Sequence, residues 1–287
     1  MQKVIYINDF GQSIELSNSG PFKLKKFDQG VPKTTMISTK SPNQDGKTHH
    51  ETLLEERTPQ IEGIIEGINY EDLFNKRASL FKIFNPKIKG YLIYTNDAGT
   101  HKIKCSVQDG PSIKDKVEFV QEFLIQFYCP DPYYKEQFET KEELALWQGD
   151  FQFEFEITES GIELGHRVST LIVNANNTGD IPCGMRIEFT ALATVVNPSI
   201  LNVYTQEFIK VKRTMIAGDR LVINTEFGNK KVEMIHNGVS TNVFNYIDLS
   251  STFLQLDIGD NLLRYNAESG IDNLEASIYF TPKYVGV

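Results

Sequence analysis

The sequence predicts a mainly β protein with two domains: an N-terminal β-sandwich-like domain with one helix (residues 1–138) and a C-terminal jelly-roll β-sandwich (residues 139–287). Three observations support this prediction. Short runs that alternate apolar and polar residues occur along the chain, as in strands that bury one face. Only one segment has the period of an amphipathic helix. Two prolines, Pro130 and Pro132, end a strand in mid-sequence, because proline cannot donate a ladder hydrogen bond.

The strand predictions follow this alternation. The clearest run is residues 151–157, where every odd position is apolar and every even position is polar. Weaker runs occur at residues 3–7, 22–27, 60–68, 102–107, 117–129, 186–196, 201–211, 220–225, 232–235 and 276–280. Between runs, Gly228-Asn229 and Asn237-Gly238 suit tight hairpin turns, and Gly110-Pro111 predicts a further turn. Many short strands at this spacing indicate sandwiches or jelly rolls.

One helix is predicted, over residues 70–84. Asn69 can cap its first turn, with Asp72 placed to reciprocate, and Asn85-Pro86 stops it. We expect its apolar face to cover a sheet; that face consists of Leu73, Phe74, Leu80, Phe81 and Phe84. If that face is buried, truncating Phe81 to alanine should cost about 3 to 5 kcal/mol.

The segment from Ser41 to His50 has no apolar residue and many turn formers, which predicts an exposed loop between two strands. Its length makes it a candidate contact arm. The interface residues that we expect there are Pro42, Gln44, Asp45, Gly46, His49 and His50. A mobile loop without a partner is the alternative interpretation.

Charge divides the chain near the same place as the prolines. Residues 1–138 hold 18 Lys+Arg and 18 Asp+Glu, whereas residues 139–287 hold 11 and 20, so the net charge of −9 lies in the second half. With strand periodicity stopping at Pro130 and resuming at Phe151, we place the domain boundary between Tyr133 and Gly149. No basic cluster offsets phosphate repulsion, so a nucleic-acid partner is not expected.

The termini and cysteines give further expectations. The first nine residues have a short apolar stretch without a small-residue cleavage site, which favours a first strand over a signal peptide. No run approaches the roughly 18 apolar residues of a membrane helix, so no membrane insertion is expected. Cys105, Cys129 and Cys183 are an odd, widely spaced set that fits neither a disulfide framework nor a CxxC metal site. We expect a reducing site of synthesis, and we expect Cys105 and Cys129 to pack as small hydrophobes within strands.

The usual signatures of catalysis are missing. The sequence contains no Gly-x-Ser-x-Gly elbow, Walker loop, His-Glu-x-x-His or Rossmann glycine pattern. His49-His50-Glu51 is the nearest thing to a metal constellation, but adjacent residues of an extended chain point to opposite sides. A glycosidase would need two carboxylates facing across a cleft, which sequence alone does not reveal. We therefore predict no enzyme, no metal and no cofactor.

A set of short motifs in a particular order resembles a known family. In the first half these are Pro21-Phe22-Lys23-Leu24, Gln44-Asp45-Gly46, Glu55-Glu56-Arg57, Arg77-Ala78-Ser79-Leu80, Phe84-Asn85-Pro86, Gly110-Pro111 and Cys129-Pro130-Asp131-Pro132-Tyr133. The second half has residues 176–183, Asn237-Gly238, residues 257–261 and the ending at residues 279–287. Together they resemble the distal tail (Dit) family of the siphophage baseplate, whose C-terminal domain is galectin-like.

The resemblance implies a structural protein. In that family the N-terminal domains close into a homo-hexameric ring that joins the tail tube to the tail-associated lysin or fibre hub, and sometimes to receptor-binding proteins. It also implies a place at the virion tail tip, after synthesis in the bacterial host cytoplasm. The alternative from another class is a carbohydrate-binding jelly-roll module that recognises host glycans through exposed aromatic side chains. Oligomeric state in solution discriminates the two.

Overall fold

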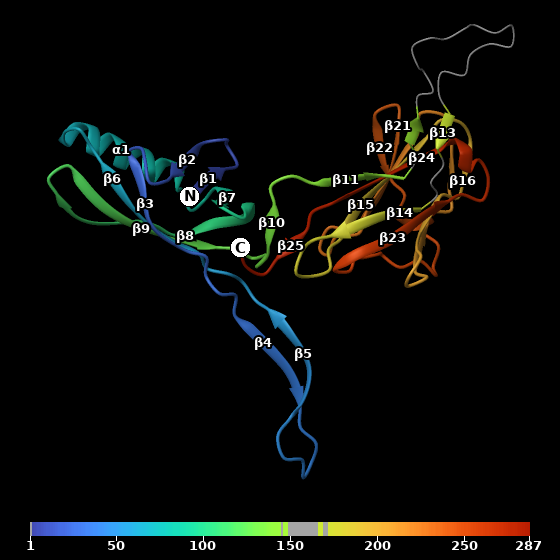
Figure 1. Ribbon diagram of the computed structural model, residues 1–287, viewed down its shortest axis with the longest axis horizontal. Coiled ribbons are helices and arrows are strands. Elements are labelled where there is room, and N and C mark those ends of the chain that lie inside the picture. The colour runs from blue at the N-terminus through green and yellow to red at the C-terminus, as the bar shows by residue number, and fades with distance from the viewer. Residues whose placement is uncertain (1, 145, 149–165, 169–171) are drawn as a thin grey trace, which may run out of the picture. The chain divides into compact units, whose positions relative to one another are not determined.

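The computed structural model describes residues 2–144, 146–148, 166–168 and 172–287. The chain forms two compact units, Met1–Gln137 with Tyr284–Val287, and Phe138–Lys283 (Figure 1). The second unit is thus inserted between residues 137 and 284 of the first. The predicted mainly β class is confirmed, and α1 (Tyr70–Ile83) is the one α-helix in the described part of the chain. No helix there is long and apolar enough to cross a membrane.

The first unit is built on one curled antiparallel sheet with the strand order β2-β1-β7-β8-β9-β6-β3; β10 lies beside β8, and β25 beside β10. The strands are β1 (Lys3–Asn8), β2 (Ser13–Leu16), β3 (Phe22–Asp28), β6 (Gln60–Glu66), β7 (Lys89–Asn96), β8 (Gly99–Val117), β9 (Val120–Tyr128), β10 (Tyr134–Glu136) and β25 (Lys283–Tyr284). The Leu24 amide donates to the Ser17 carbonyl at 2.9 Å. Because β2 and β3 are the two ends of the strand order, this contact closes the sheet on itself around one apolar core.

A separate two-stranded hairpin belongs to the first unit. Its strands are β4 (Thr34–Thr39) and β5 (Thr48–Leu54), which pair only with each other among the described strands. Figure 1 shows the hairpin extending away from the curled sheet. The predicted exposed loop between two strands is its tip, although β5 begins within the predicted loop, at Thr48.

The second unit is a β-sandwich. One sheet has the order β11-β24-β15-β20-β21-β22, and the other has the order β14-β23-β17-β18. Their bounds are β11 (Thr140–Glu143), β14 (Ile172–Asn177), β15 (Met185–Ala191), β17 (Ser199–Asn202), β18 (Phe208–Lys210), β20 (Arg220–Asn224), β21 (Lys231–His236), β22 (Val239–Asn242), β23 (Gly259–Asn266) and β24 (Leu274–Phe280). Short pairs are β12 (Leu146–Gln148) with β13 (His166–Val168) and β16 (Val195–Val196) with β19 (Thr214–Met215). Apolar residues of both main sheets form one core.

Of the two tight hairpin turns predicted in this unit, the Asn237-Gly238 turn is confirmed, whereas Gly228-Asn229 lies in a longer connection. Asn237 and Gly238 have φ of 48° and 79°, the two positive values of a type I′ turn, and they join β21 to β22. Gly228, with φ of 77°, lies between β20 and β21. The clearest predicted strand, residues 151–157, lies outside the described residues.

Two sequence expectations about the first unit are wrong, one about a turn and one about which residues the unit contains. Gly110-Pro111 does not turn the chain but lies inside β8, where the register with β9 shifts at three points. Such bulges leave residues unpaired, so the missing proline amide costs little there. The last four residues, placed by sequence in the second domain, belong instead to the first unit. The Tyr284 hydroxyl donates to the Glu136 carboxylate at 2.8 Å.

The helix has the predicted cap but a narrower buried face. Asn69 Oδ1 accepts from the Asp72 amide at 2.8 Å, and Asp72 Oδ2 accepts from the Ile68 amide at 2.9 Å. Of the predicted apolar face, Leu73, Leu80 and Phe84 are fully buried, but Phe74 and Phe81 are 46% and 45% exposed. The expected burial of those two side chains is therefore wrong. Of the predicted face, only Leu73, Leu80 and Phe84 are buried in the core beneath the helix.

Two neighbouring helix residues give a matched test of this buried face. Leu80→Ala removes a fully buried side chain and should destabilise the first unit by about 2 to 5 kcal/mol. Phe81→Ala, in place of the cost expected from sequence, should cost less than about 1 kcal/mol in the isolated chain, because Phe81 is half exposed. Denaturant unfolding measures both. Equal losses for the two variants would contradict the assigned face.

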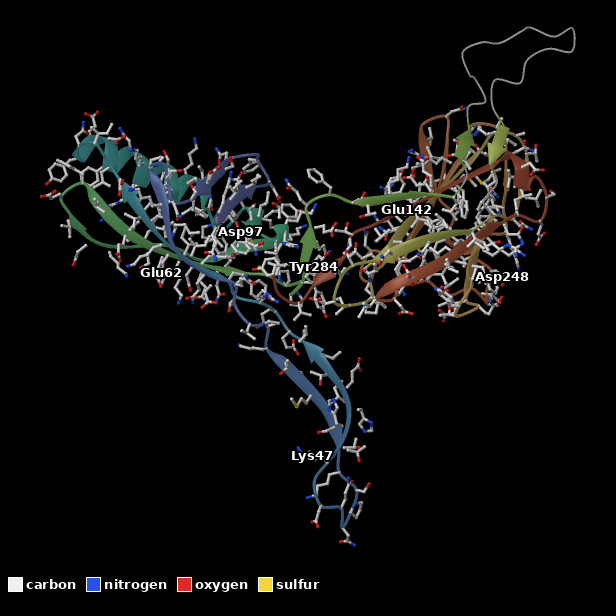
Figure 2. All side chains as sticks on the ribbon, viewed as in Figure 1. Lys47, Glu62, Asp97, Glu142, Asp248 and Tyr284 are labelled. Carbon is white, nitrogen blue, oxygen red and sulfur yellow. The ribbon has the colours of Figure 1, made fainter. Side chains whose placement is uncertain are left out.

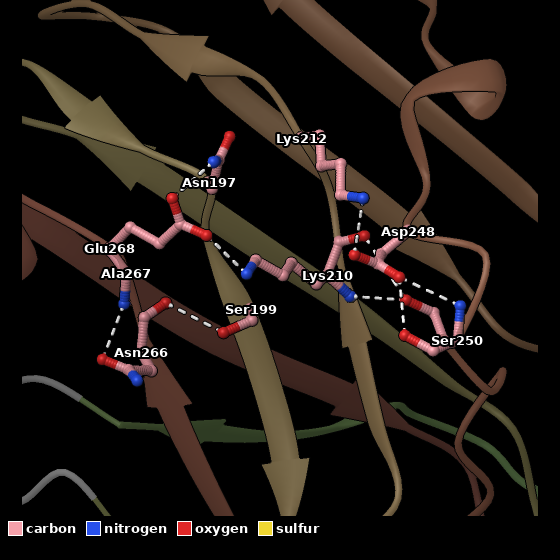
Figure 3. Close-up of polar contacts among 10 residues, drawn as sticks. Asn197, Ser199, Lys210, Lys212, Asp248, Ser250, Asn266, Ala267 and Glu268 are labelled. Carbon is pink, nitrogen blue, oxygen red and sulfur yellow. Dashed lines mark hydrogen bonds and ion pairs between the residues drawn. The ribbon is translucent and has the colours of Figure 1, made fainter.

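A network of ion pairs and hydrogen bonds lies on the second unit around β18 (Figure 3). The Asp248 carboxylate pairs with Lys212 Nζ at 2.8 Å and accepts from the Ser250 hydroxyl at 2.6 Å. The Glu268 carboxylate pairs with Lys210 Nζ at 2.5 Å and accepts from Asn197 at 2.8 Å. The Lys212 ammonium first, and then Ser250, hold the pKa of Asp248 well below its usual range. Lys210 and Asn197 lower the pKa of Glu268 in the same way.

The lowered pKa of Asp248 gives a pH prediction. A carboxyl group whose pKa falls on folding stabilises the native state above its unfolded value, about 3.9, and loses that contribution as pH falls below it. The melting temperature of Asp248→Asn should therefore lie below that of the wild type at pH 7. The difference should shrink below about pH 4. A difference that is constant from pH 7 to pH 2 would show that the charge contributes nothing.

Candidate assembly interface

The hairpin β4–β5 is the most exposed structured segment of the first unit. Its burial pattern is exposed at nearly every position of both strands. Met36, Ile37 and Leu53 are nevertheless apolar and are 69%, 41% and 43% exposed. Figure 2 shows its side chains standing away from the hairpin, with Lys47 labelled there. A two-stranded hairpin with no covered face is marginal in water, so burial against another surface would stabilise it.

The tip is ordered by its own side chains. Gln44 accepts from the Ser41 amide at 3.0 Å and donates to Thr48 Oγ1 at 3.1 Å. Asn43 and Gly46 have φ of 62° and 78°, the left-handed conformation that suits these residue types. The tip therefore has a defined turn.

The six predicted interface residues all lie on this hairpin. Pro42, Asp45 and Gly46 are exposed in the connecting turn, Gln44 is half-buried there, and His49 and His50 are exposed on β5. His50 Nε2 bonds to Thr39 Oγ1 at 2.8 Å, whereas His49 Nε2 bonds to Thr52 Oγ1 at 3.1 Å. Within the described residues, no three His, Cys, Asp or Glu side chains are grouped to hold a metal. The exposed side chains of the hairpin offer hydrogen-bonding and apolar contacts.

At the base of the hairpin lies Arg57, a buried charge that belongs to the Glu55-Glu56-Arg57 motif but was not predicted as a site residue. Its side chain is 2% exposed. Nε donates to the Pro132 carbonyl at 2.7 Å, Nη1 to the Gly30 carbonyl at 3.0 Å, and Nη2 to the Val285 carbonyl. The guanidinium also lies 4.9 Å from the centre of the Tyr134 ring. Three chain segments are thus held by one side chain.

The backbone around Arg57 is equally fixed. Its amide and carbonyl exchange hydrogen bonds with Cys129 at 3.0 and 2.8 Å. Gly30 has φ of 66°, and a Cβ there would lie 2.7 Å from the Thr58 carbonyl oxygen, so only glycine fits. The Gln29 side chain bonds both the amide and the carbonyl of Val287. Two segments connect the hairpin to the curled sheet, from Gly30 to Thr34 and from Leu54 to Arg57. Each therefore starts at a residue whose position is fixed, Gly30 or Arg57, and we call this base the mount of the hairpin.

A second apolar surface lies on the first unit near the amino end of α1. Gly67 donates its amide to the Phe119 carbonyl at 2.8 Å, which joins the start of the helix to the turn between β8 and β9. The exposed apolar side chains around this junction, with Phe81 farther along α1, are Ile68, Tyr70, Phe74, Val117 and Val120. A recess of about 650 Å³ on the β8–β9 hairpin is lined by three apolar residues, Ile113, Val117 and Val120, and by three charged ones, Lys114, Asp115 and Glu122. We call the exposed apolar side chains of this region the helix-end surface; they are Ile68, Tyr70, Phe74, Phe81, Val117 and Val120.

Two family models match the chain. The model described as Phage tail protein RIFT-related domain matches residues 10–129, and the model described as Siphovirus-type tail component, C-terminal domain, matches residues 178–284. The two matches follow one another along the chain and cover most of both units. The chain belongs to the siphophage distal tail (Dit) family. It is therefore a component of a phage tail, as the sequence motifs indicated.

Solved structures agree in fold over the whole chain. The crystal structure of the SPP1 Dit (gp 19.1) protein, a paradigm of the hub adsorption apparatus in phages infecting Gram-positive bacteria, matches with a TM-score of 0.69 at 13% identity, covering 98% of each chain. A chain of the phage P2 baseplate, activated with Ca, matches with a TM-score of 0.54 at 12% identity, covering 100% of this chain and 99% of that one. The same baseplate activated with Sr gives 0.54 at 13% identity, with the same coverage. A comparison with curated proteins gave no match.

The role of Arg57 as a mount can be measured by a double-mutant cycle. Arg57→Met leaves three carbonyl acceptors without their donor and should destabilise the first unit by about 3 kcal/mol. Deleting residues 285–287 removes one of those acceptors and should cost less. Because both changes remove the same bond, their losses should add to more than the loss in the combined variant.

Arg220→Met is the matched control for this cycle. Arg220 is a half-exposed arginine of the second unit, 3.9 Å from Glu188, and its loss should change stability by less than about 1 kcal/mol. Strictly additive losses for Arg57→Met and the deletion would contradict the proposed coupling.

Proposed function

We propose that this protein is a structural hub of the phage tail tip that assembles through its first unit into a homo-hexameric ring. The ring joins the tail tube to the tail-associated lysin or fibre hub, and in some assemblies to a receptor-binding protein. The chain is made in the host cytoplasm and acts without a cofactor or an enzymatic reaction. The number six and the partner classes follow from the family resemblance.

The observation that carries this proposal is the anchored, uncovered hairpin. Arg57 fixes the base of β4–β5, while Met36, Ile37 and Leu53 remain exposed along its length. A hairpin already held in place loses less conformational freedom on docking than a mobile loop does. This favours a contact arm over a loop without a partner, the alternative that the sequence left open.

The kind of contact follows from the asymmetry of the first unit. The hairpin and the helix-end surface are two different apolar surfaces of one chain. When one surface of a copy meets a different surface of the next, the contact is heterologous and generates a ring if the rotation closes. We infer that the hairpin of one copy covers apolar surface on its neighbour, with the helix-end surface as the candidate.

Charge supports the same division of roles. The first 138 residues are neutral overall, whereas the remaining residues carry the whole net charge of −9. Copies packed around a ring repel one another less through a neutral surface than through an acidic one. The second unit therefore suits a place outside the ring contacts.

One observation favours the glycan-binding alternative. A groove of about 290 Å³ on β17, β18 and β23 is lined by Ser199, Leu201, Phe208, Lys210, Arg264 and Asn266. An aromatic ring beside hydroxyl, amide and cationic groups is a combination that can bind a small polar ligand. Such a module would work as a monomer, so the state of the chain in solution separates the two proposals.

The ring is tested on the full chain, because residues 284–287 complete the first unit. The wild type should form a closed oligomer in light scattering and negative-stain microscopy, at least at high protein concentration. The double variant Ile37→Asp with Leu53→Asp places two charges on the exposed apolar side of the hairpin. It should remain monomeric, with the melting temperature of the wild-type monomer unchanged within about 2 °C, because neither side chain is part of the core.

Leu249→Asp is the matched control. Leu249 is a fully exposed leucine of the second unit, and its replacement should leave the oligomer intact. A wild type that stays monomeric at every concentration would exclude ring formation by this chain alone and favour the glycan-binding module. Dissociation by Leu249→Asp but not by the hairpin variant would move the contact to the second unit.

A further inference from the structure

Two of the three cysteines, widely separated in sequence, face each other in the first unit. Cys105 lies on β8, and Cys129 directly follows β9. The antiparallel register pairs Val107 with Phe127 and Ser106 with Tyr128. One further step along the same register places Cys105 opposite Cys129.

The backbone decides which kind of pair this is. The amide and the carbonyl of Cys129 both bond to Arg57, at 2.8 and 3.0 Å, so they point away from β8. Opposite residues that exchange no backbone hydrogen bonds form the closer type of antiparallel pair, with Cα atoms about 4.5 Å apart. This separation lies within the roughly 4.4 to 6.8 Å that a disulfide spans.

The Cys105 and Cys129 side chains lie on the same face of the sheet, because directly opposite residues of antiparallel strands share a face. Cys105 and Cys129 are both buried in the core of the first unit. Cys183 is buried in the separate core of the second unit. The sequence expectation that Cys105 and Cys129 pack inside is confirmed, and the two form a pair that their wide spacing in sequence concealed.

We propose that Cys105 and Cys129 form an intramolecular disulfide when the chain meets a small disulfide oxidant outside a reducing compartment. A thiolate of one cysteine attacks a sulfur of the oxidant and releases one thiol of the oxidant. The second cysteine then attacks the protein sulfur of the mixed disulfide and releases the other thiol. Two protein thiols are oxidised, one small disulfide is reduced to two thiols, and the two protein protons go to the released thiolates.

Burial sets the rate of this reaction rather than its product. Burial first, and then the neighbouring Cys129 thiol, raise the pKa of the Cys105 thiol, so little nucleophilic thiolate exists in the closed fold. Oxidation of the native chain therefore proceeds through local opening of β8 from β9. Oxidation during refolding avoids this barrier.

The disulfide would constrain the backbone next to Arg57, at the base of the hairpin. Cys129 exchanges both backbone bonds with Arg57, so a disulfide to Cys105 would tie β8 covalently to the strand end on which Arg57 rests. The proposal does not depend on the ring, because every contact used lies within one copy.

The test refolds the full chain from denaturant with oxidised and reduced glutathione, then denatures it again and alkylates free thiols with iodoacetamide. Mass spectrometry should find a single label, on Cys183, and a peptide that joins Cys105 to Cys129. The native chain incubated with oxidised glutathione should reach the same product more slowly. The oxidised chain should unfold at a temperature about 5 to 10 °C higher than the reduced one.

Cys129→Ser is the control and should keep labels on both Cys105 and Cys183. Three labels on the refolded wild type, a major link to Cys183, or glutathione retained on Cys105 or Cys129 would each overturn the proposal. A linked chain that melts below the reduced one would show that the fold does not accommodate the bond.

Discussion

The first unit depends on a buried charge. Arg57 carries a guanidinium that cannot lose its proton, in a position with almost no access to water. Such a group is tolerated only where acceptors replace its hydration, and here the acceptors are main-chain carbonyls of Pro132, Gly30 and Val285. Because these residues are far apart in sequence, satisfying one side chain fixes the entry to the hairpin, the end of the sheet and the carboxyl terminus at once.

This constraint explains why an exposed hairpin can have a defined direction. The strands β4 and β5 gain almost nothing from the core, since their side chains are exposed. Their base, in contrast, is fixed by Arg57, by the close approach of the Gly30 backbone to Thr58 and by the paired backbone of Arg57 and Cys129. A fixed base and exposed apolar residues along the length suit the docking role proposed for the hairpin, and different residues supply these two properties.

Local rules predicted the local structure. Asn69 caps α1, Asn237-Gly238 forms a hairpin turn and the turn formers around Gly46 lie at an exposed tip, because each depends on a few neighbouring residues. The failures involve distant partners. Helical spacing cannot reveal that the sheet leaves Phe81 half exposed, and proline chemistry cannot reveal that register shifts against β9 accommodate Pro111. Arg57 was invisible as a site residue, since its acceptors are carbonyl groups that every sequence contains.

After the inserted second unit, the chain returns to the first unit with residues 284–287, and these residues contribute to its hydrogen bonding. The second unit begins after Gln137 and ends at Lys283, and the residues on either side of it, Glu136 and Tyr284, are joined by a hydrogen bond of 2.8 Å within the first unit. The first unit is thus incomplete until the second has been made, because Val285 supplies an acceptor to Arg57. Residues after the second unit therefore complete the hydrogen bonding of Arg57, so a copy truncated before Val285 would lack part of the hydrogen bonding that holds the base of the hairpin.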